Sequence, residues 1–385
     1  MNNVEKNGYK KFPVIDGHLH MLRPDEVDIM AESVARTMEY YQYDRVNLCA
    51  LVQEADTIVD PYNNIRCFYV KSKLNTKENP NRVYVFGNIW HYYDERDTAE
   101  GYLEQVKLLM AQGADGIKLL DGKPEHAKTL ARPLDDPIFD KMYAYLEENQ
   151  IPIVSHVGDP ERNCDITKIP EAILKRGWYY DETFPTLQQL RDQTEGILKK
   201  FPKLKLCLAH FYFWGHEMEK TKAFFERWEN VCFDITPGGE MFVGFSEHPA
   251  EWRQFFIDYA DRIICGTDTY NTWLENIEDY EDKLVGAVRI NQVRKMLEET
   301  EAFEDSFFGR LQPMHLPEEA LEKIYYKNFL AFAGDPKPLN NELIASKLDE
   351  LMQAEKAGEI KTLPEKYVGL YQANGKKMLY YFHQK

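Results

Sequence analysis

Short apolar segments alternate with helix-like segments over most of this 385-residue chain, and this alternation constrains the fold more than any other feature. The apolar segments carry hydrophobic residues at successive positions, which is typical of strands covered on both faces. Strands that alternate with helices indicate βαβ units with right-handed crossovers. The predicted strands are residues 13–18, 45–52, 82–89, 114–120, 151–156, 204–210, 230–235 and 262–267.

Eight such units that close on themselves form an α/β fold, the (β/α)8 TIM barrel, in which helices surround a parallel barrel. A doubly wound open sheet is the competing architecture, and spacing alone does not exclude it. Gly113 is a stop signal for one of the intervening helices. The predicted helices are residues 99–112, 137–149, 185–201, 216–229 and 249–260.

Two long connections exceed what a bare barrel needs. Residues 157–184 follow the fifth predicted strand, and residues 269–315 follow the eighth and contain a predicted helix near 279–299. Long ordered loops are frequently functional, and in a barrel they lie at the rim. We therefore expect both segments to contribute to a site at one end of the barrel.

The C-terminal tail, residues 336–385, is a further addition. Its pattern predicts a helix near 340–356 and then a hairpin, because Asn374-Gly375 is a dipeptide that favours a tight turn. We expect one decorated domain, with the barrel in residues 1–335 and the tail packed on it as an extension. The hairpin could cap the barrel or pair with a second copy in a homodimer, and the sequence does not choose between these roles.

Charge and cysteine usage exclude some classes of partner. The formal net charge of −17 disfavours nucleic acids and anionic membranes, because both are repelled at long range. Cysteines without CxxC spacing, four of them in apolar runs, predict buried free thiols in a reducing compartment. The chain shows neither an apolar leader nor an 18-residue apolar stretch, so we expect a soluble cytoplasmic protein that acts on a small molecule.

The first predicted strand ends in Asp16-Gly17-His18-Leu19-His20. Residues i and i+2 of a strand point to the same face, so both imidazoles could bind one metal ion. Composition alone would give roughly 0.26 such HxH pairs in a chain of this kind, so the pair by itself is weak evidence.

Three further residues with metal-binding side chains stand at the ends of predicted strands. His156 ends the fifth strand, His210 ends the sixth, and Asp268 follows the eighth. Barrel enzymes assemble their active sites at the carboxyl ends of their strands. Each residue taken singly could instead be a hydrogen-bonded residue at the barrel end, but the register that they share favours a metal site. Imidazole nitrogen and carboxylate oxygen suit zinc, and also manganese or iron.

At these positions the sequence resembles the amidohydrolase superfamily, in its amidohydrolase-2 branch, from about residue 13 to residue 333. The resemblance implies a metal-dependent (β/α)8 barrel. It does not account for the tail or the long loops. The motifs that carry it are IDGHLH, GIKLL, PIVSHVG, LAHF, DITPGGEM, IICGTD and IYYKNFLAFAG.

The resemblance also implies roles for the residues at the strand ends. His18 and His20 match the first-strand metal ligands, His156 the fifth-strand ligand, and Asp268 the eighth-strand ligand, which can also act in catalysis. His210 matches a sixth-strand histidine that is often a catalytic group in this branch. Removing or replacing Asp268 is then expected to abolish turnover while the fold is retained.

Lys118 lies in the GIKL motif, where binuclear relatives carry a carboxylated lysine that bridges two ions. The sequence therefore contains a formally complete binuclear set, with His210 as a ligand of the second ion. We favour one divalent ion, with Zn²⁺ expected and Mn²⁺ or Fe²⁺ as alternatives. Lys118 would then contact a substrate anion or be a lysine at the barrel end, and both interpretations stay open.

Weaker candidates for substrate contacts lie on the loops. For His91, the alternative is a capping or loop role. For the aromatic residues of the fifth loop, Trp178, Tyr179 and Tyr180, the alternative is packing over the barrel rim. The predicted contacts are Trp90, His91, Arg162 and Thr236.

The expected activity is metal-dependent hydrolysis, in which an activated water attacks an amide, ester or lactone carbonyl of a small molecule. The same branch contains nonoxidative decarboxylases of unsaturated or aromatic acids, so a lyase reaction is the alternative. A catalytically inactive barrel that serves as a binding protein is a third interpretation, which the intact set of ligands disfavours.

Overall fold

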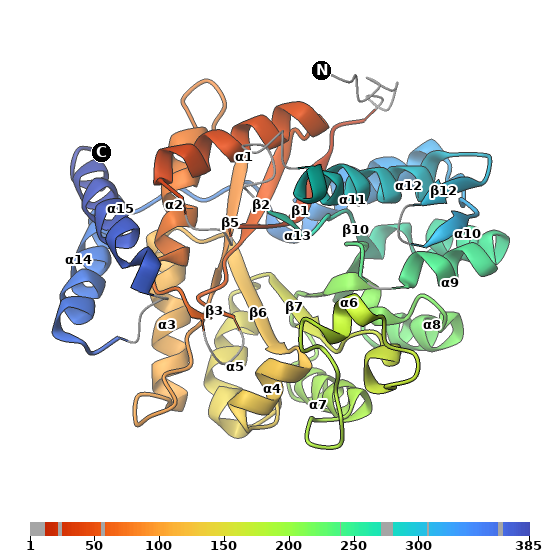
Figure 1. Ribbon diagram of the computed structural model, residues 1–385, viewed down its shortest axis with the longest axis horizontal. Helices are drawn as coiled ribbons and strands as arrows, with labels where there is room; N and C mark the ends of the chain where they lie inside the picture. The colour runs from red at the N-terminus through yellow and green to blue at the C-terminus, as the bar shows by residue number, and fades with distance from the viewer. Residues whose placement is uncertain are drawn as a thin grey trace.

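The centre of the molecule is a sheet of parallel strands that follow one another in chain order around a nearly closed barrel (Figure 1). The computed structural model describes residues 12–21, 25–54, 58–238, 240–270, 280–305, 308–360 and 365–385. The predicted (β/α)8 barrel is confirmed. Its strands are β1 (Ile15–His20), β2 (Arg45–Cys49), β5 (Val83–Asn88), β6 (Gly116–Gly122), β7 (Ile153–Val157), β8 (Leu206–Leu208), β9 (Val231–Asp234), β10 (Ile263–Ile264) and β11 (Thr269–Tyr270).

The eighth barrel strand is divided into two short pieces, and each piece pairs with a different neighbour. β10 continues the sheet from β9, whereas β11 pairs with β1. Between the two pieces, the N–H of Gly17 donates to the carbonyl of Cys265 (2.9 Å), and the N–H of Asp268 donates to the carbonyl of His18 (2.7 Å). The barrel therefore closes along a seam between its first and last strands.

The interior of the barrel is apolar and is closed at one end by α13 (Asn328–Ala333). Phe329 and Phe332 of this helix pack against side chains that come from seven of the barrel strands. An interior filled in this way is a packed core rather than a channel. The strand residues in this cluster are Ile15, Cys49, Tyr84, Phe86, Val154, Cys207, Cys232 and Ile264.

Helices form one layer around the outside of the barrel (Figure 1). The predicted helix 99–112 is found with those bounds, because the Thr98 hydroxyl accepts a hydrogen bond from the N–H of Gly101 at its start and Gly113 adopts φ 103° at its end. The other predicted helices are also present. The outer helices are α1 (Val27–Tyr41), α2 (Asn63–Leu74), α3 (Ala99–Gln112), α4 (Pro124–Leu130), α5 (Asp140–Glu148), α7 (Leu187–Lys200), α8 (Met218–Arg227), α10 (Pro249–Asp258), α11 (Tyr280–Glu298) and α12 (Glu318–Glu322).

Smaller elements decorate the connections. The long loop after β7 contains only the short helices η3 (Glu161–Cys164) and α6 (Glu171–Leu174). Two small antiparallel pairs stand outside the barrel, β3 (Gln53–Glu54) with β4 (Ile58–Val59), and β12 (Phe303–Asp305) with β13 (Gly309–Leu311). Among the described residues, no helix is long and apolar enough to span a membrane.

The tail contains two helices, and the predicted hairpin at Asn374-Gly375 is wrong. α14 (Asn341–Ala357) agrees with the prediction, but α15 (Glu365–His383) runs through the dipeptide. Asn374 is buried, and its side chain accepts from the N–H of Val27 (3.0 Å) and donates to the carbonyl of Asp25 (2.7 Å). A Cβ at Gly375 would lie 3.0 Å from the sulfur of Met352 on α14. Tertiary contacts therefore use both residues to pack a helix.

The two tail helices lie side by side at one edge of the molecule, against α2 and α3 (Figure 1). The ring of Tyr371 lies 5.0 Å from the guanidinium of the buried Arg66, and Tyr62 hydrogen-bonds Glu355. Because Asn374 also bonds residues just after β1, α15 supports the chain close to the end of that strand.

The predicted burial of the cysteines in apolar runs is confirmed. Cys49, Cys207, Cys232 and Cys265 are buried free thiols. Cys164, in the loop after β7, is exposed.

Candidate metal centre

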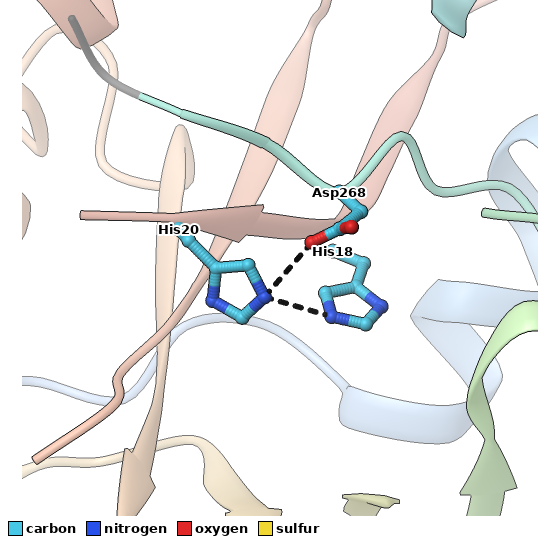
Figure 2. Close-up of side chains that lie close together, drawn as sticks. All are labelled: His18, His20 and Asp268. Atoms are coloured by element: carbon cyan, nitrogen blue, oxygen red, sulfur yellow. Dashed lines mark hydrogen bonds and ion pairs between the residues drawn. The ribbon is translucent and has the colours of Figure 1, made fainter. Parts of the chain in front are cut away.

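Three side chains that could bind a metal ion converge at the seam of the barrel (Figure 2). His18 and His20 lie on β1, and Asp268 precedes β11. The Nε2 atoms of the two imidazoles are 3.1 Å apart, and Asp268 Oδ1 is 3.1 Å from Nε2 of His20. Both histidines are buried, and the Asp268 side chain is 17% exposed. The i, i+2 spacing on β1 thus places both rings on one face, as predicted.

The contacts of Nδ1 indicate which tautomer His18 and His20 adopt. His18 Nδ1 lies 2.9 Å from Asp234 Oδ2, and His20 Nδ1 lies 2.7 Å from the carbonyl oxygen of Cys49. A carboxylate and a carbonyl accept hydrogen bonds, so we assign the proton of each neutral ring to Nδ1. Both Nε2 atoms then carry lone pairs that face each other.

This donor set fits a divalent cation. Ligand atoms bonded at ~2.0–2.1 Å in a tetrahedral zinc site lie roughly 3.3 Å apart, close to the two separations found here. A second ring nitrogen that donates to a carboxylate or a backbone carbonyl is the usual support of a metal-binding histidine. Two lone pairs that face each other beside a carboxylate attract positive charge, which a divalent ion would supply. His18, His20 and Asp268 are therefore suited to hold the metal ion that the sequence predicts.

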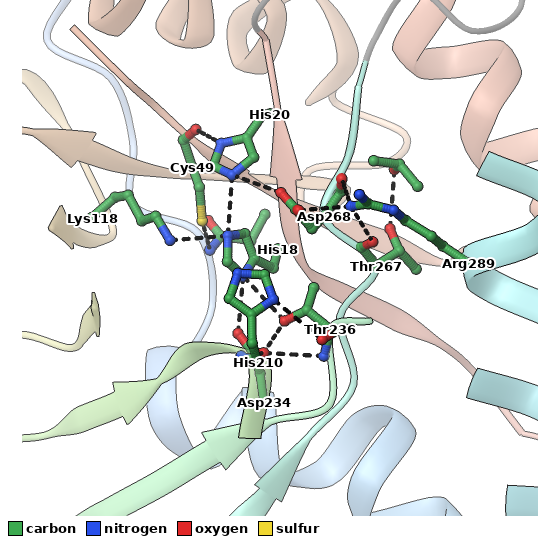
Figure 3. A network of polar contacts seen from close by, with 12 residues as sticks. His18, His20, Cys49, Lys118, His210, Asp234, Thr236, Thr267, Asp268 and Arg289 are labelled. Carbon is green, nitrogen blue, oxygen red and sulfur yellow. Dashed lines mark hydrogen bonds and ion pairs between the residues drawn. The ribbon is translucent and has the colours of Figure 1, made fainter. Parts of the chain in front are cut away.

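Asp234 is a site residue that the sequence analysis did not identify. It ends β9, and besides contacting His18 it accepts hydrogen bonds from the backbone N–H groups of His210 (2.8 Å) and Thr236 (3.1 Å) (Figure 3). Burial raises the pKa of this carboxyl group, and these contacts oppose the rise. Its position at a strand end is the same signal that identified His156 and His210, and it could have been found in that way.

Asp268 is held from two sides. Its Oδ1 faces His20, while its Oδ2 lies 2.6 Å from Nη1 of Arg289 on α11 (Figure 3). Burial alone would raise the pKa of Asp268, but the Arg289 guanidinium is the strongest of the groups that oppose burial, and the pKa lies well below its usual range. Asp268 is therefore a carboxylate at neutral pH.

Lys118, on β6, reaches the donor cluster formed by His18, His20 and Asp268. Its side chain is fully buried, and Nζ lies 2.9 Å from Nε2 of His18 (Figure 3). Burial and the Lys118 ammonium both lower the pKa of His18, which stays a neutral imidazole. The lysine thus occupies the position from which it could contact a metal ion, a bound substrate or both.

His156 and His210 lie beside the cluster, and their rings meet edge to face, with centroids 4.8 Å apart and an interplanar angle of 69°. His156 Nε2 is 2.9 Å from the carbonyl of Gly158, and the His210 ring lies 5.6 Å from that of His18. Burial lowers the pKa of both His156 and His210 to about 3. The structure thus brings three of the four predicted ligand residues into one donor cluster, with His156 next to it.

The segment that carries His210 has an unusual backbone. His210, Phe211, Tyr212 and Phe213 adopt φ of 56°, 51°, 56° and 55°, which makes a left-handed turn without glycine directly after β8. Such a conformation costs about 1–2 kcal/mol for each residue other than glycine. Two contacts offset this cost. The ring of Phe211 is fully buried and stacks 5.6 Å from that of Phe256, and the N–H of His210 donates a hydrogen bond to Asp234. The turn directs the His210 ring toward His18.

Because Phe213 has a positive φ, we expect glycine to be more stable than alanine at this position, which reverses the usual order. Phe213→Gly and Phe213→Ala both remove the ring, but only alanine keeps a Cβ that is strained at this φ. We expect the glycine variant to be about 1 kcal/mol more stable than the alanine variant in urea unfolding. On the exposed face of α3, the control pair Glu104→Gly and Glu104→Ala should show the opposite order. An alanine preference at both positions would contradict the left-handed turn.

The predicted substrate contacts Trp90 and His91 lie after β5. His91 is buried, with Nε2 2.8 Å from Asp121 Oδ1 and Nδ1 3.0 Å from the Tyr102 hydroxyl. Burial by itself lowers the pKa of His91, but Asp121 reverses this and raises it. The Trp90 ring stacks on Tyr92 with centroids 5.3 Å apart. His91 thus joins the connection after β5 to the end of β6 and to α3, which matches its alternative loop role.

Arg162 and Thr236 come from two different loops. Arg162, after β7, places Nε 3.0 Å from Oε2 of Glu240, after β9, so that one ion pair joins the two loops. Thr236 is buried, and its hydroxyl donates to Asp234 and lies 3.3 Å from Nδ1 of His18. Thr236 therefore contacts the residues that orient His18.

The aromatic residues of the fifth loop pack on the neighbouring connection. The ring of Trp178 lies 4.2 Å from the Lys123 ammonium. Tyr180 is buried, and its hydroxyl donates to Glu125 (2.8 Å) and contacts Asp159. These polar contacts join the loop to the connection that follows β6.

A nearly closed parallel barrel with two histidines and an aspartate at its carboxyl ends defines a class of metal-dependent barrel enzymes. The family model Amidohydro_2, described as amidohydrolase, matches residues 77–331, about two thirds of the chain. The chain therefore belongs to this amidohydrolase family. The match includes Lys118, His156, His210 and Asp268, whereas His18 and His20 precede it and are placed by the structure.

Solved structures match this chain at low sequence identity. An uncharacterised TIM-barrel protein from Bordetella bronchiseptica is 15% identical and covers 84% of this chain and 100% of its own, with a TM-score of 0.54. A putative amidohydrolase from Staphylococcus aureus is 15% identical over 84% and 100%, with a TM-score of 0.44. A dihydroxybenzoic acid decarboxylase from a Polaromonas species, with bound manganese, is 14% identical over 83% and 96%, with a TM-score of 0.45. Comparison with curated protein sequences gives no match.

Proposed function

We propose that this chain is a metal-dependent hydrolase that acts on an amide, ester or lactone bond of a small molecule. The observation that carries the proposal is the pair of Nε2 lone pairs of His18 and His20, 3.1 Å apart, beside the carboxylate of Asp268. Family membership supports the same chemistry. We propose one ion, with zinc as the first candidate, because nitrogen donors suit it well.

A divalent ion bound here would polarise a carbonyl and lower the pKa of a bound water. His210 is the proposed group for proton transfer, because its neutral imidazole lies beside the donor cluster, with its ring 5.6 Å from that of His18. Its Nδ1 lies 3.3 Å from the carbonyl of Thr236, so we assign the basic lone pair to Nε2. Asp268 would serve as a ligand through Oδ1, because Arg289 occupies Oδ2. His156, next to His210, would complete the proposed ligand set.

Decarboxylation is the second candidate, and one observation favours it. Lys118 is fully buried beside His18, and the hydrogen bond described for its ammonium is to an imidazole rather than to a carboxylate. A carboxylate substrate would pair with this ammonium in a site of low polarity. An aromatic or unsaturated acid is therefore the substrate class that this alternative requires.

Metal analysis of the purified protein tests the proposal. We expect about one equivalent of zinc or manganese per chain, and its loss in His20→Ala, because that variant removes one of the three converging donors. His248→Ala, which removes an exposed histidine, is the matched control and should keep the metal. Loaded enzyme is then offered lactones and esters, and separately aromatic acids with detection of carbon dioxide. Protein that neither contains nor takes up a divalent ion would refute the proposal.

A further inference from the structure

Arg289 makes three contacts around Asp268, although it lies on a helix outside the barrel (Figure 3). Its Nη1 is 2.6 Å from Asp268 Oδ2, and the same nitrogen donates to the carbonyl of Asp268 and to that of Thr267, the latter at 3.3 Å. The guanidinium therefore holds both the carboxylate and the backbone of the residue at the end of the barrel seam.

The backbone of Asp268 needs such support. It adopts φ 53°, a left-handed conformation that residues other than glycine rarely take. Its N–H is fixed by the carbonyl of His18 at 2.7 Å, and its carbonyl is fixed by Arg289. Conformations of this kind persist when surrounding contacts over-determine them. Without Arg289, one of the two backbone contacts and the hydrogen bond to Oδ2 are lost together.

The two carboxylate oxygens of Asp268 have separate partners. Oδ1 faces Nε2 of His20, and Oδ2 faces the guanidinium. A carboxylate held through Oδ2 cannot rotate Oδ1 away from the donor cluster. We propose that Arg289 is a positioning residue that fixes Asp268 as a metal ligand, an inference that rests on the proposed metal-binding function.

Two effects of Arg289 on metal affinity oppose each other. Its positive charge repels a cation, whereas its hydrogen bonds keep the ligand oxygen in place. Partners that hydrogen-bond metal ligands typically contribute roughly 10- to 100-fold to affinity when removed by mutation. The contact to the strained backbone of Asp268 adds to the second effect, so positioning should outweigh repulsion.

The test is zinc affinity, measured by competition with a chromogenic chelator. We expect Arg289→Met to bind zinc roughly 10- to 100-fold more weakly than the natural sequence. Arg289→Lys keeps the charge on a shorter side chain with a different donor geometry, so it should restore part of the affinity, and it serves as the second variant if the methionine variant does not fold. Lys295→Met removes a positive charge from the same helix, at the residue whose ammonium lies 5.5 Å from the ring of Phe303, and should leave the affinity unchanged.

A second readout is the visible spectrum of the protein loaded with Co²⁺. Loss of the Asp268 oxygen from the ion should shift and weaken the ligand-field bands in Arg289→Met and not in Lys295→Met. If the natural sequence fails to bind zinc, the proposed function falls and this inference with it. If the natural sequence binds zinc and Arg289→Met binds it equally or more tightly, only the positioning role is overturned.

Discussion

Replacing Lys71 with methionine should lower the free energy of unfolding by about 3–5 kcal/mol, because it leaves a buried carboxylate without its cation. Lys71, near the end of α2, places Nζ 2.6 Å from Oδ2 of Asp115 and 2.9 Å from the carbonyl of Gly113. Both charged side chains are fully buried. The measurement is urea unfolding at neutral pH.

The pair also joins separate parts of the fold. Asp115 accepts hydrogen bonds from the N–H of Val85, at 2.7 Å, and from the N–H of Lys337, at 2.6 Å, where the chain enters the tail. Burial raises the pKa of Asp115 and lowers that of Lys71, although each partner's charge opposes the other's shift. Burying this pair therefore costs free energy. Removing one partner destabilises the fold by more than the attraction within the pair contributes, because the other charge is left buried and unpaired.

Lys107→Met is the matched control for Lys71→Met. Lys107 forms an exposed ion pair with Glu104 on α3, and such pairs contribute about 0.2–1 kcal/mol. A loss below about 1 kcal/mol in both variants would show that the buried pair is not needed for stability.

The stability of the metal-free protein should fall with decreasing pH because of buried histidines, and His210 provides the cleanest case. Burial, with a smaller contribution from His156, lowers the pKa of His210 to about 3 in the folded protein, whereas an unfolded imidazole titrates near ~6.5. Between these values the unfolded state binds a proton that the folded state does not. Stability is therefore lost as the pH falls, by up to about 1.4 kcal/mol per pH unit for this residue.

The pH window follows from the two pKa values. The effect is absent above about pH 6.5 and complete below about pH 3, for a total on the order of 5 kcal/mol. His210→Gln removes the titrating group, so its stability should decline less steeply than that of the natural sequence between about pH 6 and pH 4. Unfolding in urea at several pH values, with a chelator present, measures both slopes.

His248→Gln removes an exposed histidine and is the control for this experiment. Its slope should match that of the natural sequence. Equal slopes for all three proteins would mean that His210 accepts its proton in the folded state as readily as in the unfolded state.

Local signals predicted most of the fold. The strands were found because their side chains are apolar at successive positions, and α3 because a capping threonine and a glycine mark its ends. The helix through Asn374-Gly375 was missed because the preference of this dipeptide for turns is outweighed by contacts to Asp25, Val27 and Met352. The contacts to Asp25 and Val27 join residues 349 and 347 positions apart, and no local pattern encodes them.

Most of the candidate site could also be predicted from the sequence. The rule that sites lie at strand ends, with the i, i+2 spacing, led to His18, His20 and Asp268, which the structure brings together. Arg289 carries no signal, because only the packing of α11 against the seam brings it to Asp268. The direction of the His156 ring depends on its contact with Gly158, which the sequence pattern does not encode.

The donor cluster lies across the seam of the barrel, so a metal ion bound there would also join the first and last strands. His20 lies on the first strand and Asp268 between the two pieces of the last, so a metal ion bound by both residues would cross-link the two edges of the sheet. Such a link closes a loop of roughly 250 residues, and cross-links across long loops restrict the unfolded chain most strongly. The donor set is also incomplete until the eighth strand has joined the first, so that capture of an ion would report that the barrel has closed.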